Sequence, residues 1–559
     1  MNLSEAQKWV GKENFDDVVG VTRRDFLTGT VAAGIASGAG LGSIYFGYGK
    51  SVGSPLRVGV VGTGDEGSVL LGAHNPEYLN VVAIADIRPY NVFRAFHGDV
   101  SSPSANTARP GLMAKYKWGT EDEARKTVKV YGAYEELLAD KNVEAVVIAL
   151  PLHLHAEAAI KAMRAGKHVL TEKLMGHSIH ECKEMGRVSR ETGKILATGH
   201  QRHYSILYDD AVHTIGTAKL IGDVHSIRAQ WHRGNLPGKD SWQPPLPDDA
   251  SLAKKLAGWK QDLEKAKPAD IDGLRQRIAQ LEAQIADTAV DAAAHGYTEM
   301  TLADGRPRTP LEELIRWRLW NRTGGGLMAE LGSHQLDAAG IFVSAMHGAG
   351  QKVKPLTVTA VGNRSIFPAD REIDDHVYCM YEYPAPGYDE DKNKKIVVTY
   401  SSINGNGFGG YGEVVLGTKG TLILEQEQDV MLYKDAAKDT RVTVAKAKDG
   451  SPTLDTTESG AGSAAVGGKG SDSAPPSRGY TEEMEHWAWC IRNPAPENQP
   501  RCKPEVAIAD AVIALVSNIA LANPDTQARI EFKPEWFDIA SDETPEGVKP
   551  DVTRDRYRV

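Results

Sequence analysis

The feature that most constrains this chain is a glycine-rich loop directly after a short apolar run. Residues 56–61 hold three valines, which predicts a buried parallel strand. Gly62, Gly64 and Gly67 follow with the spacing G-x-G-x-x-G, and the next segment can form a helix. Glycine at these places permits a tight turn, a close approach of the backbone to a pyrophosphate, and close packing of helix on strand. The pattern predicts a strand–loop–helix unit that binds a dinucleotide at the helix N-terminus.

An acidic residue ends the next predicted strand. Residues 81–85 are apolar and lead into Asp86. A carboxylate about 20 residues beyond the glycines is placed to accept a hydrogen bond from a ribose 2′-OH. Asp86 therefore favours NAD, whereas Arg88 nearby could meet the 2′-phosphate of NADP. We expect NAD rather than NADP.

Strand and helix patterns alternate up to residue 202. Runs at 143–150, 168–170 and 195–200 predict further buried strands with helices between them. Repeated units of this kind form a parallel sheet, which binds its ligands at the carboxyl ends of the strands. The residues expected to contact the cofactor are therefore Gly62, Thr63, Gly64, Asp65, Glu66, Gly67, Asp86, Arg88, Leu150, His153, His155, Glu172, Lys173 and Gln201.

The pattern changes near residue 222, where alternating runs begin. They predict strands at 224–231, 356–362, 376–383, 395–401, 412–416 and 420–424, before two helices at 480–492 and 504–522. The predicted fold is an α/β Rossmann domain with a doubly wound parallel sheet, followed by an α+β domain with an open, mostly antiparallel sheet.

We divide the chain into four parts: an N-terminal segment (1–50), a Rossmann domain (51–202), an α+β domain for substrate and oligomerisation (203–530) and a tail (531–559). The α+β domain holds a helical insertion at about 236–310, which could form a lid, an oligomer contact or a surface decoration. Its apolar residues Leu274, Ile278, Leu281 and Ile285 predict one helix. Residues 435–478 are rich in Ser, Gly and Ala and are predicted to be a disordered surface loop.

Two adjacent arginines mark the N-terminal segment. Residues 1–21 are polar and are expected to be unstructured. Arg23 and Arg24 precede a weakly apolar run to about residue 47, which resembles a twin-arginine export signal. We expect a periplasmic or otherwise exported protein, with this segment either cleaved or retained as a membrane tether. The route moves folded proteins, so the cofactor would be tightly bound during export.

The whole-chain composition is that of a globular protein. A net charge of −10 argues against a nucleic-acid partner. The four cysteines are far apart and lack metal-ligand spacing, so we expect buried free thiols and no metal site.

Several motifs resemble the glucose-fructose oxidoreductase, inositol dehydrogenase and MocA (Gfo/Idh/MocA) family. They are VGVVGTGDEG at 58–67, the pair Glu172-Lys173, GGGLMAELGSHQLD at 324–337 and GTKGTLILE at 417–425. The resemblance covers about 56–430 and 480–525. It implies an NAD(P)-dependent oxidoreductase that moves hydride to or from a sugar, polyol or sugar derivative. It also implies a homo-oligomer formed through the open sheet.

The resemblance assigns catalytic roles to three residues. Lys173 would polarise the developing alkoxide, and His334 would accept the hydroxyl proton, with Glu330 four residues before it. Two positions depart from the family pattern: Leu174 replaces proline, and Glu330 replaces aspartate. The longer acid could change the position of the substrate.

Candidate substrate contacts follow the last Rossmann strand and flank the insertion. They are Arg202, His203, Tyr204, His232, Arg233, Trp320 and Asn321, with the adjacent Trp231, Trp317 and Arg318 as further candidates. Aromatic faces with Arg, His and Asn suit a sugar ring, although packing explains the tryptophans equally well.

Two other functions remain open. One is an NAD-dependent glycosidase, in which transient oxidation at C3 allows elimination of the glycosidic bond. The other is a non-catalytic, cofactor-bearing sugar-binding protein.

Overall fold

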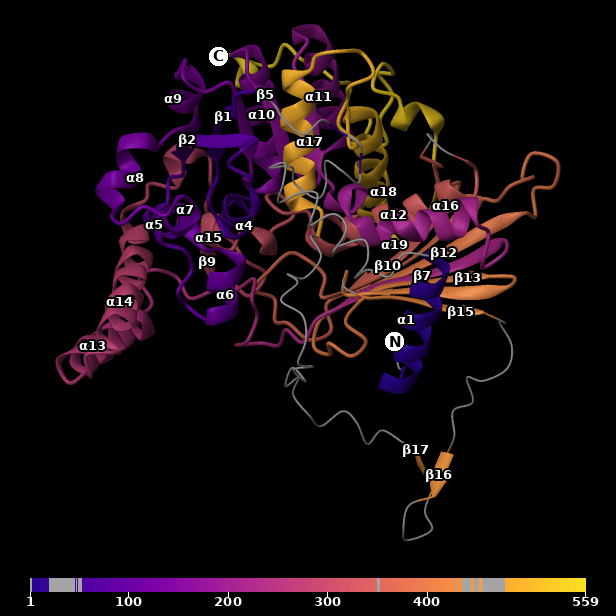
Figure 1. The fold of residues 1–559 in the computed structure, drawn as a ribbon, viewed down its shortest axis with the longest axis horizontal. Coiled ribbons are helices and arrows are strands. Elements are labelled where there is room, and N and C mark those ends of the chain that lie inside the picture. Colours follow the sequence, from indigo (N-terminus) through magenta and orange to yellow (C-terminus); the bar gives the residue numbers. More distant parts are fainter. Residues whose placement is uncertain are drawn as a thin grey trace.

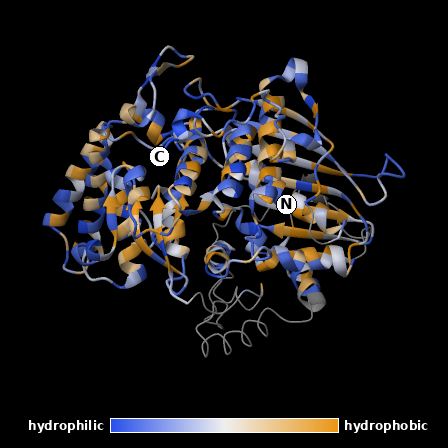
Figure 2. Cartoon of the chain, turned by 90° about the horizontal axis from the view of Figure 1, so that it is seen from above, coloured by the Kyte–Doolittle hydropathy of each residue, from blue (hydrophilic) through white to orange (hydrophobic). Residues whose placement is uncertain are grey.

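A computed structural model describes residues 3–19, 46, 48, 53–348, 352–427, 429–434, 444–446, 452–454 and 478–559. Two sheets dominate the described residues, and each has helices packed on it (Figure 1). Apolar residues are concentrated on the strands and on the sides of the helices that face them (Figure 2). The predicted two-part fold, a parallel Rossmann sheet followed by a mostly antiparallel sheet, is confirmed.

The first domain is a doubly wound parallel sheet with strand order β3-β2-β1-β4-β5-β6. Its strands are β1 (Leu56–Val61), β2 (Leu79–Ala85), β3 (Lys129–Tyr131), β4 (Ala145–Ile148), β5 (His168–Glu172) and β6 (Leu196–Gly199). Its helices are α4 (Asp65–Ala73), α5 (Pro89–His97), α6 (Pro103–Ala108), α7 (Gly111–Tyr116), α8 (Glu121–Thr127), α9 (Tyr134–Ala139), α10 (His155–Arg164) and α11 (Ile179–Thr192). Every strand pair is parallel. The carboxyl ends therefore meet along one edge.

The second domain holds an eight-stranded sheet in the order β15-β14-β13-β7-β12-β11-β10-β18. Its strands are β7 (Val224–His232), β10 (Thr357–Asn363), β11 (His376–Pro384), β12 (Lys395–Ile403), β13 (Tyr411–Gly417), β14 (Gly420–Glu425), β15 (Asp429–Lys434) and β18 (Arg529–Glu531). The first strand was predicted to be antiparallel. It is antiparallel to β13 but parallel to β12, so the sheet is mixed.

Helices cover one face of this sheet. They are α12 (Ile206–Val212), α16 (Ser333–Ala345) and α18 (Pro504–Ala522), with the short α19 (Pro524–Gln527) after α18. Helix α17 (Tyr480–Arg492) packs instead on α4, β2, β5 and β6 of the first domain, and α15 (Pro310–Ile315) follows the insertion. Among the described residues, α18 alone is long and apolar enough to span a membrane, but 67% of that apolar stretch is buried. It packs against α11 and β10, as a core helix of the fold.

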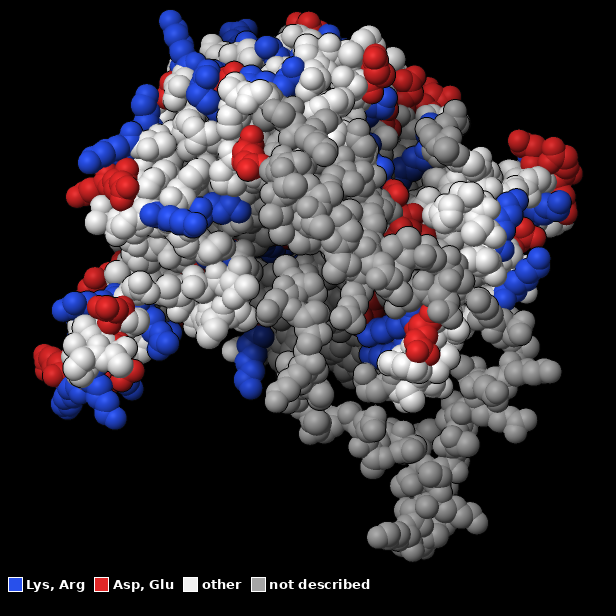
Figure 3. Space-filling view, viewed as in Figure 1, with Lys and Arg blue, Asp and Glu red and all other residues white. Residues whose placement is uncertain are grey.

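The insertion after β7 contains two helices where one was predicted. They are α13 (Ala250–Glu264) and α14 (Ile271–Ala286), and a short hairpin of β8 (Met300–Thr301) and β9 (Pro307–Arg308) follows. The first helix was missed because it is mostly solvent-exposed, with only Leu252 fully buried. The two helices form a projecting hairpin (Figure 1), where side chains of both charge signs lie side by side (Figure 3). Helix α14 packs against α5 of the first domain.

The N-terminal residues correct a second prediction. Residues 1–21 were expected to be unstructured, but Glu5–Val19 form helix α1. The helix packs on β15, where Met431 is buried together with Val414 and Ile423. These three side chains alternate with those that enter the main core, so α1 covers the opposite face of the sheet. The arginine pair lies outside the described residues.

The four cysteines are buried free thiols, as predicted. The segment predicted to be a disordered loop, 435–478, lies largely outside the described residues. Within it the structure describes β16 (Val444–Lys446), β17 (Pro452–Leu454) and Arg478.

Candidate functional site

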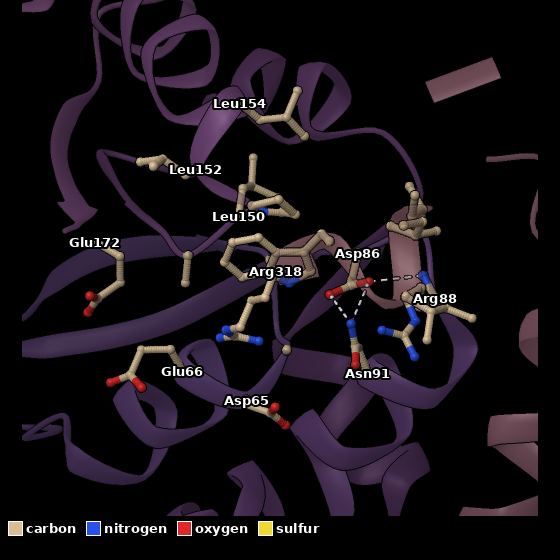
Figure 4. A pocket seen from close by; sticks show the side chains of 18 of the residues that line it. Asp65, Glu66, Asp86, Arg88, Asn91, Leu150, Leu152, Leu154, Glu172 and Arg318 are labelled. Carbon is tan, nitrogen blue, oxygen red and sulfur yellow. Dashed lines mark hydrogen bonds between the residues drawn. The ribbon is translucent and has the colours of Figure 1, made fainter. Parts of the chain in front are cut away.

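A cavity of about 1140 Å³ opens at the carboxyl ends of the Rossmann strands. Residues of the first domain, the insertion and the start of the α16 region line it. Glu66 and Glu172 lie at one end and Asp86 at the other, with Arg318 between them (Figure 4). The volume exceeds the usual range for a small ligand, so the cavity has room for a dinucleotide and a small substrate together.

The glycine loop fits a dinucleotide. Gly62 has a φ of +85°, and a Cβ there would lie 2.4 Å from the carbonyl oxygen of Ala149. A Cβ on Gly67 would lie 2.1 Å from the carbonyl oxygen of Gly62. Gly64 differs, because a Cβ there would meet nothing closer than Asn91 Nδ2 at 3.8 Å, and it faces the cavity. Two glycines therefore shape the loop, and Gly64 leaves space in which a pyrophosphate can approach the backbone.

The first turn of the following helix is acidic. Asp65 forms an ion pair with Arg94 at 2.7 Å. Burial raises the pKa of Asp65, but the charges of Arg94 and Arg318 outweigh that effect and lower it to about 2. The carboxylate is thus neutralised locally, which leaves the helix N-terminus compatible with an anion.

The end of β2 carries the expected ribose-binding acid. Asp86 Oδ2 accepts hydrogen bonds from the backbone N–H of Thr63 at 2.7 Å and from Asn91 Nδ2 at 3.2 Å. Asp86 Oδ1 accepts one from the backbone N–H of Arg88 at 2.9 Å (Figure 4). These donors fix the carboxylate at the mouth of the cavity, where a ribose diol would lie.

The three predicted catalytic residues meet in the cavity. Lys173, Glu330 and His334 all line it. Lys173 Nζ donates to the carbonyl oxygen of Glu330 at 2.8 Å. Glu330 belongs to a π-helical turn, Met328–Gly332, at the start of α16. The Lys173–Leu174 peptide bond, where the family has proline, is cis.

Glu330 has a partner that the sequence did not reveal. Arg318 Nε donates to Glu330 Oε2 at 2.7 Å. Burial alone would raise the pKa of Glu330, but the positive charges of Arg318 and Lys173 more than offset it and lower the pKa. Glu330 is therefore an ionised group that is fixed in place, rather than a proton acceptor.

His334 is held neutral. Burial lowers the pKa of its imidazole, and the positive charges of Lys173 and Arg202 lower it further. Its ring lies 5.6 Å from that of Trp231, which stacks on Tyr411 at 4.4 Å. A neutral imidazole that faces the cavity is able to accept a proton.

Two buried carboxylic acids lie beside Lys173. Burial and the neighbouring charge of Glu66 raise the pKa of Glu172 to about 8. Burial also raises the pKa of Glu66, against the opposing charge of Lys173. One oxygen of each acid has no hydrogen-bond partner among the described residues. Glu172 therefore holds a proton at neutral pH, and Glu66 beside it is shifted in the same direction.

The remaining cofactor candidates have mixed positions. Leu150, His153 and His155 line the cavity. The ring of His155 lies 2.9 Å from the carbonyl oxygen of Leu174 and 2.8 Å from that of Leu150, so it joins the ends of two strands. Three candidates lie off the lining: Thr63, Gly67 and Gln201.

The structure does not bring the predicted substrate residues together. Of the seven main candidates Arg233 alone is on the cavity lining, and the other six lie elsewhere: Arg202, His203, Tyr204, His232, Trp320 and Asn321.

Each of the six has a local partner. Arg202 donates to Gln335 at 2.8 Å, and His203 contacts Asp337 at 2.9 Å. Tyr204 contacts His486 at 2.9 Å. The ring of His232 lies 2.9 Å from Ser401 Oγ. Trp320 is buried under Arg308, and the backbone N–H of Asn321 donates to Glu372 at 2.9 Å. The further candidates Trp317 and Arg318 do line the cavity, whereas Trp231 does not.

Much of the lining comes from the insertion, for which a lid, an oligomer contact and a surface decoration had all been open. Its cavity residues include Trp242, Pro244, Pro245, Gln284, His295 and Tyr297. Nothing in the local sequence predicts that these residues line the cavity. They are far from the first domain along the chain and come close to it only in the folded structure.

Residues 56–200 match the model of an oxidoreductase family with an NAD-binding Rossmann fold, the Gfo/Idh/MocA family. This stretch is therefore similar to the NAD-binding Rossmann domain of that family.

Two curated proteins illustrate the similarity. The chain is 36% identical over 107 residues to 1,5-anhydro-D-fructose reductase of Ensifer adhaerens, which covers 19% of this chain and 30% of that protein. It is 33% identical over 179 residues to a glycosyl hydrolase family 109 protein of Shewanella amazonensis. That alignment covers 29% of this chain and 36% of the relative. The chain spans about a third of the length of the curated relatives it matches.

Among solved structures, an aldose-aldose oxidoreductase from Caulobacter crescentus superposes with a TM-score of 0.49 at 14% identity. The superposition covers 86% of this chain and 100% of that one.

Proposed function

We propose that the protein is an NAD(P)-dependent oxidoreductase that exchanges hydride with a CH–OH carbon of a sugar, polyol or sugar derivative. The observation that carries this proposal is the convergence of Lys173 and His334 on the cavity that Gly64 faces. The 1,5-anhydro-D-fructose reductase among the relatives supports a carbohydrate substrate.

Each residue of the site has a separate role in the proposed reaction. When bound, the nicotinamide supplies the site that accepts or donates hydride. His334, neutral in the cavity, takes the hydroxyl proton as the C–H bond breaks. The ammonium of Lys173 donates toward the oxygen on which negative charge develops. Arg318 holds Glu330, whose carbonyl oxygen positions the lysine.

The cofactor, localisation and assembly belong to the same proposal. Asp86 favours NAD over NADP, and the enclosed cavity supports tight binding. We also propose export by the twin-arginine route, with the N-terminal segment cleaved or kept as a tether, and pairing of subunits through the open sheet.

The test begins with the dinucleotide released from purified, denatured protein, identified by its mass and spectrum. A sugar panel is then followed at the nicotinamide absorbance band. Lys173→Met and His334→Asn should keep bound dinucleotide and lose turnover by about 10²–10⁴-fold. Lys260→Met, on the exposed insertion hairpin, is the matched control. Bound dinucleotide with unchanged turnover in both site variants would contradict the proposal, and dinucleotide without any turnover would favour a binding protein.

A second candidate function is an NAD-dependent glycosidase. The glycosyl hydrolase family 109 relative, 33% identical over 179 residues, favours it. In this reaction C3 is oxidised, the C2 proton is removed and elimination releases the aglycone with a C1–C2 double bond; water then adds at C1 with a proton at C2, and the hydride returns to C3. Release of aglycone from an aryl glycoside without net reduced cofactor would identify the glycosidase and exclude simple dehydrogenation.

A further inference from the structure

We propose that the insertion 236–310 is a clasp over the adenosine end of the dinucleotide, and that its Asp287 commits the site to NAD. This inference rests on the proposed function, because it concerns how the same cavity holds its cofactor. It assigns a specificity role to a residue about 200 positions from the glycine loop, which the family resemblance does not cover.

Asp287 binds the segment that follows the ribose-binding acid. Its Oδ2 accepts from Arg88 Nε at 2.8 Å, and its Oδ1 accepts from the backbone N–H of Tyr90 at 3.0 Å. The Asp287 side chain is 0% exposed and that of Arg88 is 16% exposed. The contact therefore joins the end of α14 to the start of α5 in a site largely closed to water.

A second anchor lies two turns earlier on the same helix. Gln280 Oε1 accepts from the backbone N–H of Val100 at 2.8 Å, and its Nε2 donates to Asp99 Oδ1 at 3.0 Å. Gln280 is 6% exposed. The helix is thus fixed to the Rossmann domain by buried polar contacts at two points.

An apolar contact completes the clasp next to the cofactor acid. Ile87, directly after Asp86, packs into a cluster whose buried members are Ala292, Tyr297 and Leu314. Tyr297 lines the cavity and also contacts the ring of His153 edge-on at 5.7 Å. The residue that follows the ribose-binding acid is therefore covered by the insertion. A dinucleotide bound there could leave only if these contacts opened.

The same geometry disfavours a 2′-phosphate. Arg88 is the cation beside Asp86, and its guanidinium is already paired with Asp287. A phosphate on the 2′-oxygen would lie next to the carboxylate of Asp86. The carboxylate of Asp287, on the far side of Arg88, would add to the negative charge around it. Two carboxylates in a poorly hydrated site repel an added phosphate more strongly than they would in water. A free 2′-OH meets no such repulsion and can donate to Asp86.

The test separates retention from specificity. Apoprotein is titrated with NADH and with NADPH by fluorescence, and dissociation rates are measured by displacement. Asp287→Asn, which keeps the shape of the side chain, should lower the ratio of NADPH to NADH Kd by roughly tenfold because Arg88 is released. Asp272→Asn, exposed on the same helix, is the matched control and should leave the ratio unchanged.

Gln280→Ala should raise the dissociation rates of both dinucleotides by roughly tenfold and leave their ratio unchanged. Gln276→Ala, an exposed glutamine on the same helix, is its control. Thermal unfolding checks that each variant is folded. If Asp287→Asn and Gln280→Ala bind and release both cofactors as the wild type does, the clasp is wrong. If the wild type binds neither dinucleotide, the proposed function itself fails.

Discussion

Arg318 and Glu330 form an ion pair in which Nε and Oε2 lie 2.7 Å apart, inside the cavity and beside Lys173. The acid differs from the aspartate of the family pattern, and the extra methylene lets its carboxylate reach the arginine. Its carbonyl oxygen meanwhile holds the ammonium of Lys173. The pair therefore orients the lysine through the backbone of the π-helical turn.

We expect Arg318→Gln to reduce kcat by about 10–100-fold with cofactor still bound, because Glu330 would lose its partner and the turn its fixed position. Arg318→Lys should keep part of the rate, because lysine retains the positive charge that pairs with Glu330. Steady-state kinetics on the best sugar of the panel provide the measurement. Arg275→Gln, on an exposed arginine, is the control, and equal kcat in Arg318→Gln and the wild type would contradict the role.

The neutral state of His334 predicts a pH profile. Its pKa is lowered by burial and by Lys173, so the neutral base persists below the ordinary histidine value of 6.5. The rate of substrate oxidation should stay constant as the pH falls through 6.5 and drop only at lower pH. The dependence of kcat/KM on pH measures this, with pH-independent binding of the dinucleotide as the control. A decline centred at or above pH 6.5 that His334→Asn abolishes would contradict it.

Two glycines of the loop should respond differently to alanine. Gly67→Ala should lower the free energy of unfolding by about 1–3 kcal/mol, because its Cβ would lie 2.1 Å from the carbonyl oxygen of Gly62. Gly64→Ala should leave stability nearly unchanged but weaken dinucleotide binding at least tenfold, since its Cβ would occupy the open space above the loop. Urea unfolding and fluorescence titration separate the two effects. Binding unaffected by Gly64→Ala would mean that the pyrophosphate lies elsewhere.

Glu172 predicts a pH dependence of stability. Its pKa rises from 4.5 in the unfolded chain to about 8 in the fold, so the native state holds an extra proton between these values. The stabilisation is fully present below about pH 4.5 and is lost as the pH rises to about 8. Glu172→Gln should therefore gain stability relative to the wild type as the pH rises from 5 to 8, in urea unfolding. Glu136→Gln, on an exposed acid, should show no such trend, and a parallel trend in both variants would refute the assignment.

Local sequence predicted the first domain well. A parallel sheet of this kind repeats a short strand–helix pattern, and the conformation of the glycine loop depends on residues close together in the sequence. The loop at Gly62 and the strand end at Asp86 are in the predicted places. The partners of those residues were not predictable. Asp287 reaches Arg88 from about 200 residues further along the chain, and nothing in its neighbours signals that contact. Arg318 was a candidate substrate contact, but its pairing with Glu330 appears only in the fold. The mixed sheet was missed for the same reason: alternation in residues 224–231 reports one buried face, and it does not report the direction of the neighbouring strand.

Helix α1 gives the N-terminal segment a topological property. Asn14 Nδ2 donates to the carbonyl oxygen of Leu432 at 3.0 Å, and Lys12 pairs with Asp429 at 2.9 Å. Further along the chain, Tyr48 donates to Glu485 at 2.7 Å. Described contacts thus hold the chain to the fold on both sides of the arginine pair. A single proteolytic cut between residues 19 and 46 would leave both pieces attached, so native mass would stay that of the intact chain while denatured mass would fall into two fragments.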